Sequence, residues 1–167
     1  TEQINKLRFE SAEEVIKRKF FKLPMGKWSG FVNDEKFDIN KFVDQNDYGN
    51  RCRKIPEIFD TIDFMYLLGI FIGDGFSCNQ SQGYSINLCI PKNDKARNKL
   101  IQVLKRMQLK YREYDKEIQI SSKALYTIGL ECNKGALNKK IPEWALQYSK
   151  KYLSELLNGL IDSDGWY

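Results

Sequence analysis

One short phrase occurs twice in this chain. Residues 67–75 read LLGIFIGDG, and residues 157–165 read LNGLIDSDG. Each copy is an apolar run with a glycine at its third position and Asp-Gly at its end. A glycine inside a helix lowers its stability by about 1 kcal/mol relative to alanine, so two glycines at matched positions indicate helices that approach closely there. We therefore expect Asp74 and Asp164, which end the two runs, to converge.

Two convergent aspartates predict a metal site. Neighbouring carboxylates repel each other and raise each other's pKa, and a divalent cation removes that repulsion. Oxygen ligands without His or Cys favour a hard cation, Mg²⁺ before Zn²⁺, and such an ion can activate water and stabilise charge on a phosphate. A lone Asp-Gly is an ordinary helix stop, and only its repetition in matched phrases favours a site. Asp162 replaces the Ile72 of the first copy, so we expect it to be structural.

The composition narrows the chemistry further. The chain has no histidine, and its four cysteines show no C-x-x-C spacing, which argues against classical zinc sites and against Ser-His-Asp or Cys-His centres. The cysteines fit reduced thiols in an intracellular protein, in the cytoplasm, nucleoid or an organelle. No apolar run reaches the roughly 18 residues of a membrane-spanning helix, so we expect no membrane partner.

Positive charge gathers in one stretch. The net charge is +5, but residues 91–116 alone contain nine Lys or Arg against three Asp or Glu. This distribution suits a polyanionic partner, although a solvated helix face gives the same pattern.

The periodicity from residue 56 onward predicts an α+β domain with an antiparallel sheet. We expect helices over 61–72, from the cap Asp94 onward, and from Ser149 through Ile161. We expect strands over 76–79 and 84–90, and a hairpin over 111–121 that turns near Asp115. Tyr126, Ile128 and Leu130 alternate with polar residues and predict a further strand, and residues 133–137 a helical turn. Residues 1–55 differ, with a short helix over 11–19, an aromatic, turn-rich stretch over 20–31 and a polar loop over 44–53.

The paired phrases resemble the two motifs of LAGLIDADG homing endonucleases, specifically the dodecapeptide type found within inteins. The resemblance covers residues 56–167, and the Lys-Lys-Ile-Pro at 139–142 matches a block that precedes the second motif in those proteins. It implies an αββαββα unit followed by the start of a second, pseudo-symmetric unit. It also implies hydrolysis of phosphodiester bonds at specific sites of double-stranded DNA with Mg²⁺.

The resemblance assigns roles to particular residues. It makes Asp74 and Asp164 the metal-binding acids, with the backbone carbonyls of Gly73 and Ser163 as further ligands. It makes Lys139 the catalytic lysine, with Lys140 as the alternative, where a cation could orient water or neutralise a phosphate. Polar strand residues on the solvent face of the sheet should contact bases, and nearby lysines should contact phosphates. These residues are Ser85, Asn87, Arg112, Gln119 and Ser121 for bases, and Lys92, Lys110, Lys116 and Lys123 for phosphates.

The two ends of the chain depart from a complete intein nuclease. Residues 1–55 resemble the intein segment upstream of the nuclease, but no Thr-x-x-His and no terminal His-Asn occurs. Only Trp166 and Tyr167 follow the second motif, so we expect a fragment whose remaining strands belong to the rest of the intein or host protein. A partner chain that supplies them, or a decayed nuclease, is an alternative. A non-cleaving maturase of the same fold is the competing function, and a role in trans-splicing ranks below it.

Overall fold

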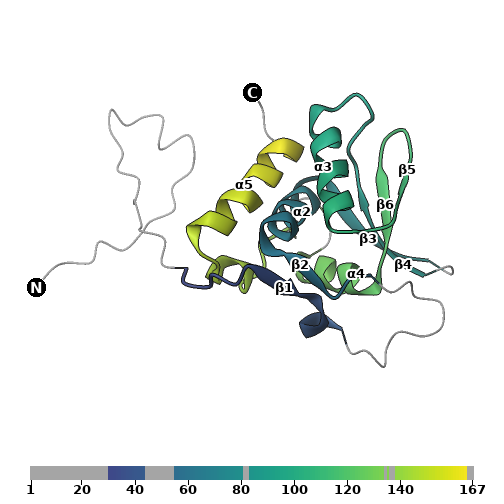
Figure 1. Ribbon diagram of the computed structural model, residues 1–167. Helices are drawn as coiled ribbons and strands as arrows, with labels where there is room; N and C mark the ends of the chain where they lie inside the picture. Colours follow the sequence, from purple (N-terminus) through teal and green to yellow (C-terminus); the bar gives the residue numbers. More distant parts are fainter. Residues whose placement is uncertain (1–29, 44–54, 81–82, 134, 136–137, 165–167) are drawn as a thin grey trace, which may run out of the picture.

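The computed structural model describes residues 30–43, 55–80, 83–133, 135 and 138–164 (Figure 1). The predicted helix over 11–19 and the polar loop over 44–53 lie outside these residues, as do most of the aromatic stretch and the turn at 133–137. Among the described residues, no helix is long and apolar enough to cross a membrane.

The described residues form a series of short strands and helices. They are β1 (Lys36–Asp38), η1 (Ile39–Phe42), β2 (Ile58–Asp60), α2 (Thr61–Asp74), β3 (Gly75–Gln80), β4 (Gly83–Leu88), α3 (Lys95–Arg106), β5 (Tyr111–Glu113), β6 (Ile118–Ser121), α4 (Lys123–Glu131), η4 (Ala145–Gln147) and α5 (Lys150–Asp164). From α2 to α4 this is an αββαββα unit, and α5 follows it. The predicted α+β class is confirmed.

A four-stranded antiparallel sheet has the order β3-β4-β6-β5. Side chains alternate between the faces of a strand, so directly paired residues share a face. Ile86 pairs with Ile120 and Leu88 with Ile118, and this apolar face is covered by helices. Ile86 lines one small cavity with residues of both α2 and α4. Asn87, between them, points to the opposite, polar face.

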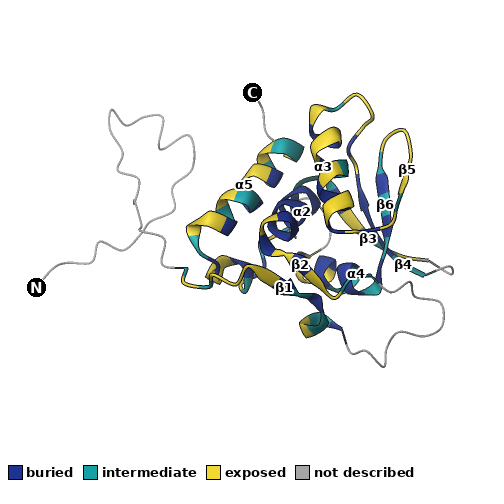
Figure 2. Ribbon diagram, viewed as in Figure 1, coloured by how far each residue is buried: buried dark blue, intermediate teal, exposed yellow. Residues whose placement is uncertain are grey.

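Helix α2 is the centre of the molecule. Figure 1 shows it between α5 on one side and α3 with the sheet on the other. Figure 2 shows it buried along most of its length, whereas α5 alternates between buried and exposed positions. The nearly all-apolar sequence of α2 explains this, because only a helix surrounded by other elements can bury every side.

The small sheet of β1 and β2 packs beside the start of α2. Its antiparallel register pairs Phe37 with Phe59, and the Phe37 ring stacks 3.8 Å from that of Phe64 in α2. Residues before and after position 55 therefore share one core here. The predicted boundary between segments 1–55 and 56–167 stays a prediction.

The predicted strand at Tyr126, Ile128 and Leu130 is wrong, because these residues belong to α4. The Ser122 hydroxyl accepts a hydrogen bond from the Leu125 amide and caps the helix. A serine at this position is a helix-start signal that the strand prediction did not take into account. Leu125 and Ile128 face the core at helical spacing, whereas Leu130 is 38% exposed. Helix α2 also runs two residues past the predicted end, and the capping of α3 by Asp94 is confirmed.

Candidate functional site

The two repeated phrases form α2 and α5, and the helices touch at their matched glycines. A β-carbon placed on Gly69 would lie 3.0 Å from the Gly159 Cα, and one on Gly159 would lie equally close to the Gly69 Cα. Each would also collide with a backbone carbonyl of the facing helix, that of Leu156 or Tyr66. No larger residue fits at either position, so the predicted close approach is confirmed.

The approach continues to the ends of both helices. A β-carbon on Gly73 would collide with the Ser163 side chain and lie 3.6 Å from Oδ2 of Asp164. Asp74 is the last residue of α2, and Asp164 is the last residue of α5. The pKa of the Asp74 carboxyl is raised, first by partial burial and then by the negative charge of Asp164. Asp164 is therefore close enough to Asp74 to disfavour the ionised form of the Asp74 carboxyl.

Lys139 reaches the same place from the segment between α4 and η4. Its Nζ donates hydrogen bonds to the backbone oxygens of Gly73 (2.6 Å) and Phe71 (3.3 Å), which are carbonyls of the last turn of α2. Partial burial lowers the pKa of this lysine, while both aspartates act to raise it. Lys140 is exposed, so the structure brings Lys139 and not its neighbour to the two aspartates.

The donor set at this place suits a hard divalent cation. It consists of two carboxylates and the backbone carbonyl of Gly73, with Ser163 one residue before Asp164. Among the described residues, no group of three or more His, Cys, Asp or Glu gathers that could hold a metal by itself. Mg²⁺ is usually held by one or two carboxylates together with waters and substrate phosphates, and two acids are enough for such an ion.

No protein-family model matches this chain, and no curated protein sequence matches it. A matching solved structure is that of an I-DmoI variant in complex with its target DNA, nicked in one strand, in the presence of manganese. The match has a TM-score of 0.42 and 19% identity and covers 62% of this chain. The chain spans 61% of the length of that protein. At this degree of likeness, a function must be argued from the chain's own residues.

The predicted base-contacting residues share one face of the sheet. Asn87 pairs with Gln119, which also pairs with Arg112, and Ser85 pairs with Ser121, all on the face away from the helices. Ser85 and Asn87 are only 7% and 6% exposed, so the expectation that they face solvent is wrong. They lie on the central strand β4, where neighbouring side chains cover them. Gln119 and Ser121 are half-buried, and Arg112 is exposed.

The predicted phosphate-contacting lysines lie in different environments. Lys110 and Lys116 are exposed, at the two ends of the stretch containing β5. Lys92 is exposed but pairs with Asp115 at 2.6 Å. Lys123 is half-buried, with its Nζ 5.6 Å above the Tyr84 ring.

Asp162 accounts for the asymmetry between the two phrases. Its Oδ2 accepts hydrogen bonds from the Tyr66 hydroxyl (2.8 Å) and from Lys99 Nζ (2.9 Å). It thus links α5 to α2 and α3, as a structural residue does. The predicted site residues do not include Glu117, although it follows the alternation of Gln119 and Ser121. Its side chain lies against that of Asn87 on the polar face.

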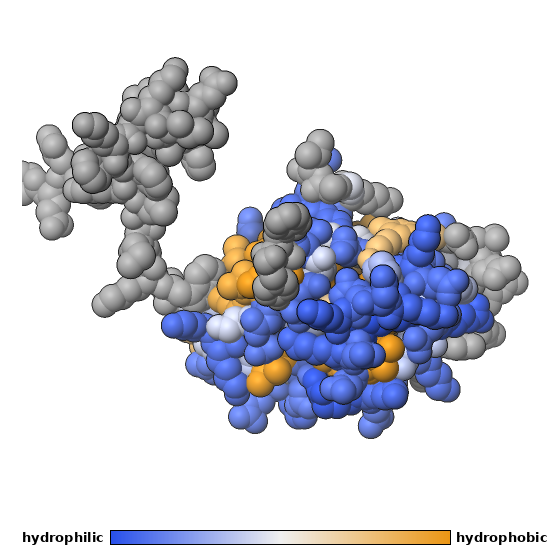
Figure 3. All heavy atoms as spheres, turned by 90° about the horizontal axis from the view of Figure 1, so that it is seen from above, coloured by the Kyte–Doolittle hydropathy of each residue, from blue (hydrophilic) through white to orange (hydrophobic). Residues whose placement is uncertain are grey.

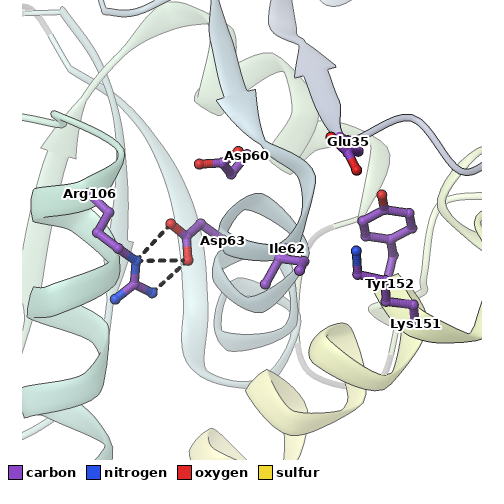
Figure 4. Close-up of a pocket in the computed structure, with 7 residues that line it drawn as sticks. All are labelled: Glu35, Asp60, Ile62, Asp63, Arg106, Lys151 and Tyr152. Carbon is purple, nitrogen blue, oxygen red and sulfur yellow. Dashed lines mark hydrogen bonds and ion pairs between the residues drawn. The ribbon is translucent and has the colours of Figure 1, made fainter.

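A separate pocket of about 380 Å³ lies at the other end of α2 (Figure 4). Its lining combines acidic, basic and apolar residues: Glu35, Asp60, Ile62, Asp63, Arg106, Lys151 and Tyr152. The Asp63 carboxylate already accepts three hydrogen bonds from the Arg106 guanidinium. The start of α2 is thus held by an ion pair, whereas Asp74 at its other end forms no ion pair within the part of the chain that the structure describes.

Proposed function

We propose that this protein is a divalent-metal-dependent endonuclease that cuts double-stranded DNA at specific sites, of the LAGLIDADG homing type and encoded within an intein. The observation that carries the proposal is the convergence of Asp74, Asp164 and Lys139. Repeated helices bring two carboxylates together, and a lysine from a third segment lies beside them. If these carboxylates were purely structural, we would expect each to form an ion pair with a basic side chain, as Asp63 does with Arg106.

Each group has a distinct task in this proposal. Asp74 and Asp164 would hold the cation, Mg²⁺ in the cell, which would supply an activated water and charge neutralisation at the scissile phosphate. The Gly73 and Ser163 carbonyls would add oxygen ligands. Lys139, held by the Gly73 oxygen, keeps a positive charge beside the phosphate where negative charge develops during cleavage.

The polar sheet face and its basic border are the proposed DNA-binding surface. Gln119, Ser121 and Arg112 lie on that face, and Lys110 and Lys116 lie near its edge. Base contacts from the strands would give sequence preference, and the lysines would bind phosphates.

The test is cleavage of a DNA duplex that contains the host gene without its insertion. The protein is incubated with this duplex and Mg²⁺ or Mn²⁺, and products are resolved as single and double breaks. We expect Asp74→Asn and Asp164→Asn to reduce cleavage at least a hundredfold, since each removes a metal ligand.

Asp162→Asn is the matched control, because it makes the same change two residues from Asp164 on the same helix. We expect it to cut at the rate of the unaltered protein once folding is verified. Cleavage that persists in Asp74→Asn would contradict the proposal. DNA or RNA binding without any cleavage would instead support a maturase-like or decayed protein of the same fold.

A further inference from the structure

One carboxylate lies on a face that otherwise suits DNA. Glu117 immediately precedes β6 and shares the alternation of Gln119 and Ser121, which face away from the helices. The other acids near this hairpin are paired, Glu113 with Arg97 and Asp115 with Lys92. Among the described residues, Glu117 has no ion pair and is half-buried. A carboxylate without an ion pair on a DNA-binding face is repelled by phosphates, so its presence there needs a reason.

Buried polar groups hold Glu117 in place. The Ser85 hydroxyl donates to Oδ1 of Asn87 at 3.4 Å, which orients the amide so that Nδ2 faces the glutamate. Nδ2 lies 3.5 Å from both Glu117 carboxylate oxygens. Because Ser85 and Asn87 are nearly inaccessible, they cannot read bases themselves. They can fix the direction of a neighbour that does.

We propose that Glu117 is a specificity-determining residue that accepts a hydrogen bond from the N4 amino group of a cytosine in the major groove, with Ser85 and Asn87 positioning it. This inference rests on the proposed DNA-binding function. Guanine N7 and O6 and thymine O4 are acceptors and would repel the carboxylate. Adenine offers a donor, but its N7 acceptor lies beside it, so a two-oxygen carboxylate suits cytosine better.

The position of Glu117 places this base near the cleavage site. Asn87 is followed two residues later by Cys89, whose amide donates to the backbone oxygen of Asp74 at 2.8 Å. A base contacted by Glu117 would therefore lie at the end of the sheet next to Asp74.

The test compares the sequence preferences of three proteins. Unaltered protein, Glu117→Gln and Glu57→Gln are each bound in EDTA to a randomised DNA duplex library, and bound molecules are sequenced. Glu57 is exposed beside β2, in the other sheet, and its replacement removes the same charge. We expect Glu117→Gln to shift the preferred base at one position from cytosine to adenine, because glutamine pairs with adenine N6 and N7. The ratio of adenine to cytosine among bound molecules should rise roughly tenfold at that position. Asn87→Ala should weaken selection at that same position.

The possible results separate the two claims. An unaltered protein that enriches no sequence would overturn both the DNA-binding proposal and the role of Glu117. If the unaltered protein is selective and Glu117→Gln gives the same profile at every position, only the role of Glu117 is overturned. A change that Glu57→Gln reproduces would show a general charge effect and would also overturn it.

Discussion

At the scale of single residues, the site holds charges that the folded protein does not fully compensate. Partial burial and Asp164 both disfavour the ionised form of Asp74, and Lys139 only partly offsets them. Lys139 is itself disfavoured as a cation by burial. Such an incompletely compensated cluster is the arrangement expected of a functional site rather than of a structural ion pair.

Asp74→Asn should therefore stabilise the protein in the absence of metal. The pKa of Asp74 is higher in the folded protein than in the unfolded chain, so stability falls as pH rises through the window between these two values. Above that window the ionised carboxylate destabilises the fold, and asparagine removes the charge. In EDTA at pH 7 we expect the Tm of Asp74→Asn to exceed that of the unaltered protein by a few degrees, measured by differential scanning calorimetry. The difference should shrink as pH falls toward 4.

Asp115→Asn is the control of opposite sign. The hydrogen bond from Lys92 lowers the pKa of Asp115, so its ionised form is the one favoured in the folded protein. Its replacement should leave the Tm unchanged or slightly lower. Mg²⁺ should raise the Tm of the unaltered protein but not that of Asp74→Asn, and an equal response in both would argue against metal binding at Asp74.

Some residue positions could be read from the sequence and others could not. The repetition of the phrase was enough to place Asp74 beside Asp164, because helices that pack through matched glycines end together. The burial of Ser85 and Asn87 was not readable, because alternation gives the face of a strand and not what covers it. Only the folded structure shows that the polar residues of β4 are enclosed, whereas those of β6, which is also an inner strand, are half-buried.

At the scale of elements, the contact between α2 and α5 determines the geometry of the site. Gly69 and Gly159 allow the two backbones to touch. The closeness of Asp74 and Asp164 at the ends of the helices depends on this short distance between the helix axes. Glycine has a low intrinsic helix propensity, so both residues lower the stability of the helices that contain them. Their presence shows that tertiary packing outweighs helix propensity here.

Gly159→Ala should destabilise the protein although alanine is the better helix former. The added β-carbon would collide with the Tyr66 carbonyl and lie 2.9 Å from the Ile70 nitrogen, both backbone atoms that cannot rotate away. We expect a loss of about 1–3 kcal/mol in the free energy of unfolding, measured by urea titration. Asn158→Ala, at the exposed neighbouring position, should be neutral or slightly stabilising. Equal stability of the two variants would mean that the helices do not touch at Gly159.

The ion pair between α2 and α3 should respond asymmetrically to mutation. The Asp63 side chain is 8% exposed, whereas that of Arg106 is 56% exposed. Arg106→Ala leaves a buried carboxylate without its partner and should lower stability by about 1–3 kcal/mol. Asp63→Asn leaves an arginine that water can solvate, and it should have the smaller effect in the same urea titration. The reverse order would show that the pair is not arranged as described.

Helix α4 shows where element prediction from one sequence fails. Tyr126, Ile128 and Leu130 alternate over only five positions, which is too short to distinguish a strand from a helix by period alone. The helical phase becomes visible when Leu125 is counted and Ser122 is recognised as a cap. Longer patterns, such as those of α2 and α3, left no such ambiguity.

At the scale of the whole molecule, part of the excess positive charge is paired with carboxylates of the same chain. Of the nine cations at 91–116, four form ion pairs: Lys92, Arg97, Lys99 and Arg106. The other five are exposed and have no ion pair among the described residues: Lys95, Lys105, Lys110, Arg112 and Lys116. The described surface is mostly hydrophilic in the view from above, with a few hydrophobic patches (Figure 3). These five charges are available to a polyanion.

Salt dependence of DNA binding should report which of these charges meet phosphates. Each neutralised phosphate releases counterions and contributes about −0.9 to the slope of log K against log salt concentration. We expect Lys110→Gln and Lys116→Gln each to make that slope less steep by about 0.9, measured by fluorescence anisotropy on one duplex. Lys36→Gln should leave it unchanged, because Lys36 pairs with Asp60 on the β1–β2 sheet.

Arg112 should behave differently from these lysines, because it lies on the polar face opposite Gln119 and not only at its edge. A guanidinium that pairs with guanine O6 and N7 changes sequence preference as well as total affinity. Arg112→Gln should therefore weaken binding to the preferred duplex by more than binding to an unrelated one, whereas Lys110→Gln should weaken both equally. If Arg112→Gln also weakens both equally, the sheet face contributes charge alone, and sequence discrimination must come from other residues.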